Sequence, residues 1–239
     1  MLNDSVKLIV KKVFPVTPNQ RYDKQTKRIM KIVLEEQSTF VDVGSHKGEI
    51  LSEALKISPK GKHFAFEPIP YLYNKLKAKY GQSCEIKNFG LSDKKTKSDF
   101  QHVVSNSAYS GIKLRTYPKA ENIETIQIEL DTLDNQLKKH DRVDLIKIDV
   151  EGGEFGVLKG AINIIDKFHP VIVFEHGIGA SDHYETSPTD IFEFFNSIDY
   201  QLFTLKGFID DSDPLTMIEF HELFHTNKEY YFLGKLRVF

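Results

Sequence analysis

The feature that most constrains the fold is a regular alternation of short apolar runs with helix-like patterns. Runs of this length between helices are typical of βαβ units, in which a mostly parallel sheet is covered by helices on both faces. The apolar runs lie at 39–45, 63–68, 84–92, 144–150, 170–176, 200–207 and 230–236. Helical patterns lie at about 21–37, 46–57, 70–80, 154–167 and 188–198, with Pro188 at a predicted first helical turn.

Two regions depart from this alternation. Between 93 and 131 the sequence predicts two further strands around a long polar loop at 105–122, and loops of this length often contribute to binding. The last two apolar runs leave little room for a crossover helix, so we expect a terminal antiparallel pair. We predict an N-terminal extension at 1–20, then a single domain at 21–239 with the strand and loop insertion near 93–131.

Composition narrows the possible functions. The 239 residues are enough for one substantial core, and the formal net charge of −2 provides no general attraction for nucleic acid. The single cysteine, Cys84, excludes an intrachain disulfide and a metal site built from several cysteines, and it fits a cytoplasmic location. The N-terminal segment is too short and too interrupted by lysine to span a membrane. It could form a short amphipathic element that packs on the domain or touches a membrane surface.

The first strand and its glycine turn, FVDVGSHKGEI, predict a ligand site beyond the carboxyl ends of the strands. Gly44 permits a tight turn and close approach of a ligand, and Gly48 lets the next helix pack near the strand. The middle glycine of the dinucleotide fingerprint is missing, because Ser45, His46 and Lys47 occupy that stretch. Asp42, inside the strand, either braces the turn through backbone N–H groups or contacts a cationic ligand.

The second strand ends in FEP, and Glu67 follows Gly44 by 23 residues. An acidic side chain at this place commonly accepts hydrogen bonds from the two hydroxyls of a ribose. The alternative is a surface carboxylate that caps the next helix. The ribose interpretation favours a cofactor that contains adenosine.

A third set of residues, DLIKIDVEGGEFGVLKG at 144–160, joins a buried strand to three carboxylates and two glycines. Asp149 and Glu151 lie on the same side of an ideal strand, where two close carboxylates can raise one pKa and create a general base. Alternatively, they satisfy N–H groups of the loop. Glu154 falls in the first turn of the next helix, where the helix dipole favours an anion. Lys147 could be a buried counter-ion.

These blocks, together with KNFGLSD and PVIVFEH, resemble the FkbM family of class I S-adenosylmethionine-dependent methyltransferases over about 20–210. The family pattern reads V-D-V-G-A-N-x-G, F-E-P, N-x-A-L-S-D and K-I-D-V-E-G-x-E-x-x-V-L-x-G. Here Ser45 and His46 replace the usual Ala-Asn, and Gly90 replaces Ala. The resemblance implies an α/β, Rossmann-like class I methyltransferase fold, with a seven-stranded, mostly parallel sheet, one antiparallel strand, helices on both faces, and methyl transfer to oxygen.

The resemblance also assigns roles to residues. S-adenosyl-L-methionine is expected at the cofactor-binding residues Asp42, Gly44, His46, Gly48, Glu67, Asn88, Gly90, Leu91 and Ser92. For the catalytic residues we predict Asp149 as the first base candidate, His176 as the second, and Glu151 beside them. His176 could equally be structural, and no metal is predicted, although Asp149, Glu151, Glu175 and His176 could supply ligands.

The function expected from this site is S-adenosylmethionine-dependent O-methylation of a hydroxyl on a sugar, a glycan or a specialised metabolite. The expected partner is a small-molecule or glycan acceptor, with no nucleic acid and no integral membrane segment, and the oligomeric state stays open. The alternatives are an NAD(P)-dependent oxidoreductase, which GSHKG disfavours, and a non-catalytic cofactor-binding subunit, which the acidic cluster disfavours.

Overall fold

The protein is a three-layer α/β structure in a computed structural model that describes residues 17–139 and 142–237. Its central sheet has the strand order β3-β2-β1-β7-β8-β10-β9. All neighbours pair in parallel except β10, which is antiparallel to both β8 and β9. The strands are β1 (Phe40–Val43), β2 (His63–Phe66), β3 (Cys84–Lys87), β7 (Leu145–Ile148), β8 (Val171–Glu175), β9 (Tyr200–Thr204) and β10 (Tyr231–Leu236). The predicted sheet, with its one antiparallel strand, is confirmed.

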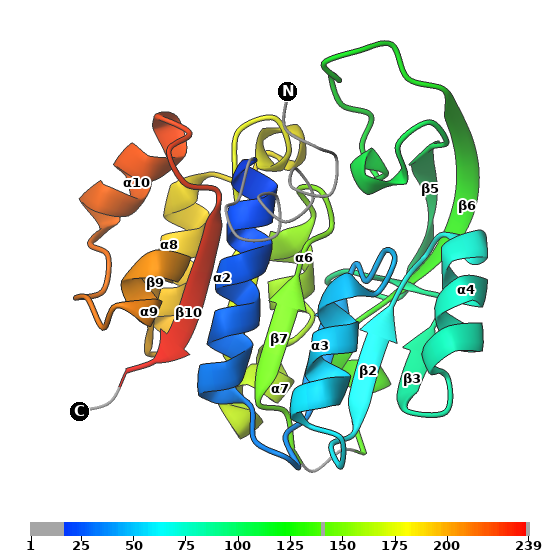
Figure 1. Cartoon of the computed structure of the whole chain (residues 1–239). Helices are drawn as coiled ribbons and strands as arrows, with labels where there is room; N and C mark the ends of the chain where they lie inside the picture. The colour runs from blue at the N-terminus through cyan, green and yellow to red at the C-terminus, as the bar shows by residue number, and fades with distance from the viewer. Residues whose placement is uncertain (1–16, 140–141, 238–239) are drawn as a thin grey trace, which may run out of the picture.

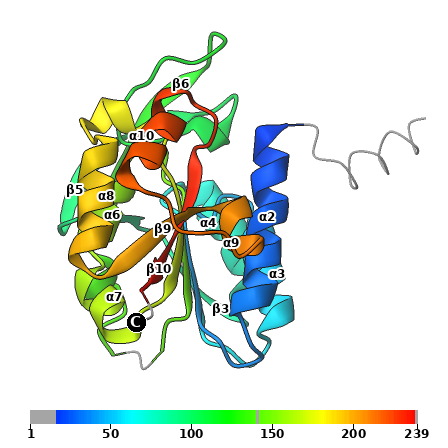
Figure 2. The same cartoon turned by 90° about the vertical axis from the view of Figure 1, so that its left-hand side faces the viewer.

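Helices cover both faces of this sheet (Figure 2). One face carries α2 (Pro18–Val33), α3 (Glu49–Ile57), α4 (Pro70–Tyr80) and α9 (Leu205–Ile209). The other face carries α5 (Leu133–Gln136), α6 (Glu154–Lys159), α7 (Ile162–Phe168), α8 (Pro188–Ser197) and α10 (Met217–His225). The strands β1, β2 and β7 are buried at every position, which explains why their sequences read as continuous apolar runs.

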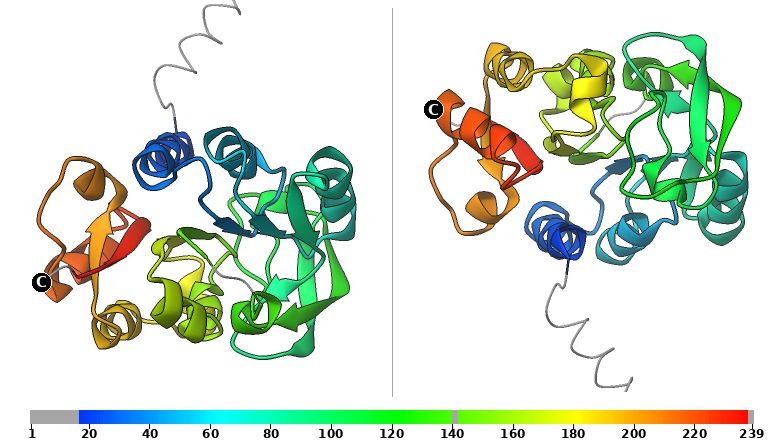
Figure 3. Two further views of the ribbon diagram at one scale, coloured as in Figure 1. Left: turned by 90° about the horizontal axis from the view of Figure 1, so that it is seen from below. Right: turned by 90° about the horizontal axis from the view of Figure 1, so that it is seen from above.

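A second, three-stranded sheet stands beside α4 at the carboxyl end of the main sheet (Figures 1 and 3). It has the order β4-β6-β5, with β4 (Gly90–Leu91), β5 (Thr96–Val103) and β6 (Ile123–Asp131). A separate apolar cluster fixes it to the body of the protein and consists of Ile69, Leu72, Phe100, Ile128 and Leu130. The two extra strands predicted in this region are therefore present. The β5–β6 connection contains the short helix η1 (Ser107–Tyr109) and extends above the ends of the main strands (Figure 1).

Several predicted boundaries were wrong. The run at 84–92 is divided between β3 and β4, which belong to different sheets. The run at 200–207 changes to α9 at Leu205, and the pattern at 154–167 is two helices, α6 and α7. The terminal pair β9–β10 is antiparallel as predicted, but α9 and α10 lie between its strands in the chain.

Helix starts follow their capping residues. Thr17 accepts a hydrogen bond from the backbone of Gln20 and forms a capping box ahead of Pro18. Ser187 does the same ahead of Pro188, which confirms the predicted start of α8. Of the predicted extension at 1–20, only residues 17–20 are described, and they form the cap and first turn of α2. The amphipathic segment predicted before them lies outside the described residues.

Candidate functional site

Two adjoining cavities open at the carboxyl end of the parallel strands, where ligands bind in open α/β sheets. Their volumes are about 410 and 180 Å³. Gly44, Pro68, Phe100 and Val150 line both, so the two cavities form one continuous cleft.

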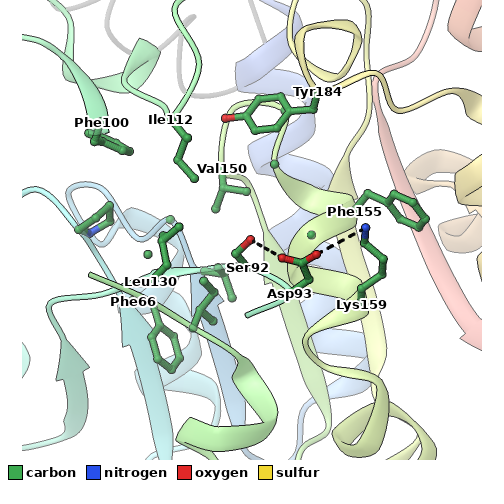
Figure 4. Close-up of a pocket in the computed structure, with 18 of the residues that line it drawn as sticks. Phe66, Ser92, Asp93, Phe100, Ile112, Leu130, Val150, Phe155, Lys159 and Tyr184 are labelled. Carbon is green, nitrogen blue, oxygen red and sulfur yellow. Dashed lines mark hydrogen bonds and ion pairs between the residues drawn. The ribbon is translucent and has the colours of Figure 1, made fainter. Parts of the chain in front are cut away.

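The larger cavity has several apolar and aromatic side chains in its walls, together with polar groups (Figure 4). Its walls include Phe66, Phe89, Leu91, Phe100, Leu130, Val150 and Phe155. At one end Asp93 accepts a hydrogen bond from Ser92 and lies 3.8 Å from the ammonium of Lys159. Gly90, Leu91 and Ser92, which we predicted to bind the cofactor, line this cavity. Asn88 does not line it, because its amide donates to the carbonyl oxygens of Glu67 and Pro68 and thereby holds the β2 turn.

The smaller cavity, called the polar cavity below, has many polar and charged side chains among its lining residues. It is lined by Asn19, His46, Glu67, Ser107, Ser110, Asp149, Glu151, Glu175 and Tyr231, among others. These residues come from α2, from the loops after β1, β2 and β7, from the β5–β6 connection, from the end of β8 and from β10. The fold therefore brings predicted cofactor-binding and predicted catalytic residues to one space.

The turn after β1 is forced by the neighbouring strand. Gly44 has φ +78°, and a Cβ there would lie 1.9 Å from the carbonyl oxygen of Asp149. No other residue fits so close to the end of β7. Gly48 has a different role from the one predicted, since it does not line either cavity and its added Cβ would meet Leu76 and Tyr80 of α4. It is a packing residue between α3 and α4.

His46 joins the β1 turn to two other parts of the cleft. Its backbone N–H donates to Oε2 of Glu67 at 2.8 Å, and its ring Nε2 lies 2.9 Å from Oγ of Ser107. The residue has φ +48°, a conformation that His, Asn and Asp adopt more readily than most residues. The Asn of the family pattern would suit the same backbone. Burial lowers the pKa of His46, and Lys47 lowers it further.

Glu67 lies at the floor of the polar cavity and is 3 % exposed. Its two carboxylate oxygens accept from the backbone N–H groups of His46 and Ile69, at 2.8 and 2.9 Å. Burial raises its pKa to about 7. The side chain therefore both orders the turn and presents oxygens to the cleft.

Asp42 does not line either cavity, which corrects our expectation that it lies at the pocket. Its side chain is 1 % exposed inside β1 and lies 3.7 Å from Nζ of Lys147. Neither of its carboxylate oxygens has a hydrogen-bond partner among the described residues, so it does not brace the turn through backbone N–H groups. Asp42 is a buried counter-ion of Lys147, beneath the site.

The acidic cluster consists of Asp149, Glu151 and Glu175, which each place a carboxylate oxygen within 4.8 Å of the others. The register of β7 against β8 explains why Asp149 and Glu175 are close. Ile148 of β7 lies beside Phe174 of β8, so the next residues, Asp149 and Glu175, are neighbours across the parallel strands.

Glu151 reaches the cluster by a different path from the one predicted. The strand β7 ends at Ile148, and Glu151 has φ +61°, so the alternation of an ideal strand does not apply to it. Gly152 follows with φ +106°, and a Cβ there would lie 2.4 Å from the carbonyl oxygen of Ala180. Glu154 begins α6 as predicted and accepts from the N–H groups of Val150 and Gly152, which fixes the turn.

The three carboxylates have different electrostatic environments. Burial raises the pKa of Asp149, but Lys147 at 3.1 Å and the hydroxyl of Tyr231 at 2.7 Å outweigh it and hold this pKa below its ordinary value. Burial raises the pKa of Glu151 to about 8, although Arg115 pairs with it. Burial, Glu151 and Asp149 raise the pKa of Glu175 well above its ordinary value.

Sequence reasoning missed two of these partners. Arg115, in the β5–β6 connection, is 8 % exposed and forms an ion pair with Glu151. Tyr231, in β10, donates to Asp149. Nothing in the sequence relates either residue to a cluster more than 30 positions away, since only the tertiary fold brings these segments together.

His176 is not part of the cleft, which corrects its assignment as a base. Its ring stacks against Phe220 and Phe224 of α10, with centroids 5.9 and 4.7 Å away. The side chain is 1 % exposed, and burial lowers its pKa to about 4. It follows the last residue of β8, so its side chain points to the opposite face from that of Glu175.

The segment HELFH at 221–225 matches a zinc-protease motif by sequence. His221 lies 3.1 Å from the Thr189 hydroxyl, and its ring centroid is 6.0 Å from that of His225. Within the described residues, the acidic cluster is the only group of three or more close metal-ligand side chains, so this motif has no third ligand there.

The sequence profile of the methyltransferase FkbM domain matches residues 42–202. The chain belongs to the FkbM methyltransferase family. The matched domain is a methyltransferase domain, and its cofactor is S-adenosylmethionine. The fold agrees, because the sheet has the Rossmann-like arrangement with one antiparallel strand.

Individual relatives are distant. The chain is 26 % identical over 166 residues to the AMB antimetabolite synthetase AmbE of Pseudomonas aeruginosa, a match over 54 % of this chain and 8 % of that protein. The structure of methyltransferase FkbM from Methylobacillus flagellatus KT superposes with a TM-score of 0.50 at 18 % identity, over 71 % of this chain and 40 % of that one. The structure of an O-methyltransferase from Bacillus cereus, in complex with SAH, superposes with a TM-score of 0.48 at 11 % identity, over 98 % of this chain and 89 % of that one. The chain thus spans less than half the length of AmbE and of the FkbM protein from Methylobacillus flagellatus.

The residues of the cleft fit this cofactor. The glycine turn brings backbone close to the ligand space, the larger cavity has apolar and aromatic side chains in its walls, and Glu67 lines the adjoining cavity together with the acidic cluster. None of the helices in the described residues is long and apolar enough to cross a bilayer.

Proposed function

We propose that this methyltransferase transfers its methyl group to a hydroxyl of a sugar, a glycan or a specialised metabolite, rather than to a nucleic acid. The observation that carries the proposal is the position of Asp149, Glu151 and Glu175 in the same polar cavity as Glu67. An aliphatic hydroxyl is too weakly acidic to react without a base, and carboxylates are suitable bases and hydrogen-bond acceptors.

We propose the following positions for the cofactor. The aromatic and apolar walls of the larger cavity suit the adenine ring, with Asp93 at one end. Glu67 accepts hydrogen bonds from the ribose hydroxyls. The part of the turn that lines the cleft, Gly44 and His46, holds the amino-acid end. S-adenosylmethionine supplies an electrophilic methyl group on a sulfonium centre.

The chain's own residues would then align and deprotonate the acceptor. Lys147 and Tyr231 stabilise the charged form of Asp149 and lower its pKa, so we propose that it orients the reactants electrostatically rather than accepting the proton. The β5–β6 connection contributes Ser107 and Ser110, whose hydroxyls suit a polyhydroxylated acceptor. Lys147 and Arg115 bring positive charge to the cluster, so its charge balance does not require a metal ion.

The name of the curated relative AmbE, an antimetabolite synthetase, is consistent with a specialised-metabolite acceptor. The test is transfer of a radiolabelled methyl group from S-adenosylmethionine to a panel of sugars, alcohols, phenols, amines and carboxylic acids. We expect label in an ether product. A labelled amine or carbon product would contradict O-methylation, and cofactor binding without transfer to any acceptor would favour the non-catalytic subunit.

A further inference from the structure

One carboxyl of the acidic cluster differs from the other two in its ion pairing. Asp149 pairs with Lys147, and Glu151 pairs with Arg115. Among the described residues no cation forms an ion pair with Glu175, although its carboxyl lines the same cavity and lies within 4.8 Å of both neighbours. Glu175 is partly buried, so its surplus negative charge is poorly hydrated.

The charges around Glu175 indicate where a proton resides before any ligand arrives. Three carboxyl groups lie within 4.8 Å of one another, and two of them form ion pairs with Lys147 and Arg115. Lys147 and Tyr231 keep Asp149 ionised, so the proton belongs to Glu175. The charged and titratable groups around it agree with this, since Glu151, Asp149 and Glu154 disfavour its ionised form and Arg115 favours it. On the β10 side, Tyr231 lies beside Glu175 in the strand register, and the Glu175 carboxyl raises the pKa of both Tyr230 and Tyr231.

We propose that Glu175 is the catalytic base of this methyltransferase, and that it loses its proton and becomes competent only when the cationic methyl donor occupies the cleft. The inference rests on the proposed function, namely methyl transfer to a hydroxyl. A cation in the polar cavity favours ionised carboxylates around it, and Glu175 is the member of the cluster that forms no ion pair within the described part of the chain.

The proton and the electrons balance in two stages. On cofactor binding, the Glu175 proton leaves to solvent. In the reaction, the acceptor oxygen bonds to the methyl carbon, the electron pair of the broken carbon–sulfur bond stays on sulfur, and the hydroxyl proton passes to Glu175. The cleft then holds a neutral thioether and a protonated Glu175, which is the charge state before binding. The coupling would prevent the base from being ionised in the absence of the methyl donor.

The experiment compares S-adenosylmethionine with S-adenosylhomocysteine, which lacks the sulfonium charge. Calorimetric titrations of the full chain at pH 7.5, in phosphate and in Tris, give the number of protons released by each ligand from the dependence of the heat on buffer ionisation. We expect the sulfonium ligand to release more protons than the thioether. That excess should fall sharply in Glu175→Gln and persist in Glu193→Gln, a matched change at an exposed position of α8. Comparing proteins cancels any proton that the ligand itself gains or loses.

An excess that is unchanged in Glu175→Gln, or equal release by both ligands in the unmutated protein, would overturn the proposal. Failure of either ligand to bind would instead contradict the proposed function on which it rests. If Glu175→Gln does not fold, the unmutated protein labelled with ¹³C at glutamate Cδ gives a second test. One glutamate carboxyl should move to its ionised shift with S-adenosylmethionine but not with S-adenosylhomocysteine, and the absence of such a signal would also overturn the proposal.

Discussion

At the scale of the residue, Glu67 connects the order of the β1 turn with recognition of the cofactor. Glu67→Ala should weaken S-adenosylmethionine binding by roughly 1.5–3 kcal/mol for each lost charge-assisted hydrogen bond, as an upper range. Because the pKa of Glu67 is about 7, affinity should also fall as the pH is lowered from 8 to 6, and this dependence should flatten in Glu67→Gln. Calorimetric dissociation constants measure both effects, with Glu193→Gln as the control. An unchanged constant in Glu67→Ala would show that the pocket is assigned incorrectly.

Asp149 is the residue whose predicted role the structure revises most. Asp149→Asn should leave cofactor binding largely intact and reduce turnover by about 10²–10³-fold, the usual cost of removing one preorganised charge-stabilising group. Tyr231→Phe removes only one of its donors and should have a milder effect in the same direction. Turnover with an acceptor from the panel measures both. Dialysis against a strong chelator should leave activity unchanged, whereas loss of activity that Mg²⁺ restores would make Asp149 a metal ligand instead.

At the scale of the element, the β5–β6 connection closes over the acidic cluster through Arg115. Arg115→Gln should raise the KM for the acceptor far more than the KM for the cofactor, because it frees Glu151 and loosens this wall of the cavity. Lys113→Gln, at an exposed position of the same connection, is the matched control. Equal effects on both KM values would indicate general unfolding. Deleting Ser107–Ile112, the coarser test suggested by the sequence, also removes contacts of Ser110 and Gly111 with β5.

The β1 turn gives a stability prediction with an internal control. Gly44→Ala should be severely destabilising, because its Cβ would meet the Asp149 carbonyl and its φ is positive. Gly179 also has a positive φ, +92°, but a Cβ there would meet nothing within 4 Å. Gly179→Ala should therefore cost only the backbone term, about 1–2 kcal/mol. Thermal unfolding of both variants measures the difference, and equal melting temperatures would contradict the close packing of the turn against β7.

At the scale of the whole molecule, the buried acids make stability depend on pH. The pKa values of Glu67 and Glu154 are raised to about 7 and that of Glu151 to about 8, so the folded state keeps protons that the unfolded chain has already released. Their stabilisation is fully present below the unfolded value near 4.5 and is lost as the pH rises through the folded values. Buried histidines such as His176, whose pKa is lowered, act in the opposite direction, but only below about pH 6.5.

The ligand-free protein should consequently lose thermal stability between about pH 6.5 and 8.5. The melting temperature, followed by differential scanning calorimetry in buffers of equal ionic strength, measures this. The decline should be shallower in Glu151→Gln, which removes a group whose pKa of about 8 lies in that window. A melting temperature that rises over this range would show that these carboxyls are ionised and stabilised in the folded state.

The sequence by itself determined the sheet, its one antiparallel strand and the family, because buried parallel strands read as continuous apolar runs and the glycine turn, FEP and the acidic block are local patterns. It also placed Glu67 and Asp149 correctly at one edge of the sheet, since carboxyl ends of parallel strands meet there. The helix start at Pro188 follows the same logic, because capping depends on residues three positions apart, whereas the first helix begins at Pro18 and not near residue 21 as predicted.

Only the tertiary structure decided how the charges are distributed. Whether Asp42 lines the cleft or lies beneath it, and whether His176 turns toward the cleft or into the aromatic packing of α10, depends on which face of a strand meets which neighbour. Arg115 and Tyr231 reach the cluster from segments far away in the chain. The burial of Glu175 beside Asp149, from which its protonation follows, results from the register of β7 against β8, and pairing between distant strands is not encoded in either strand's own sequence.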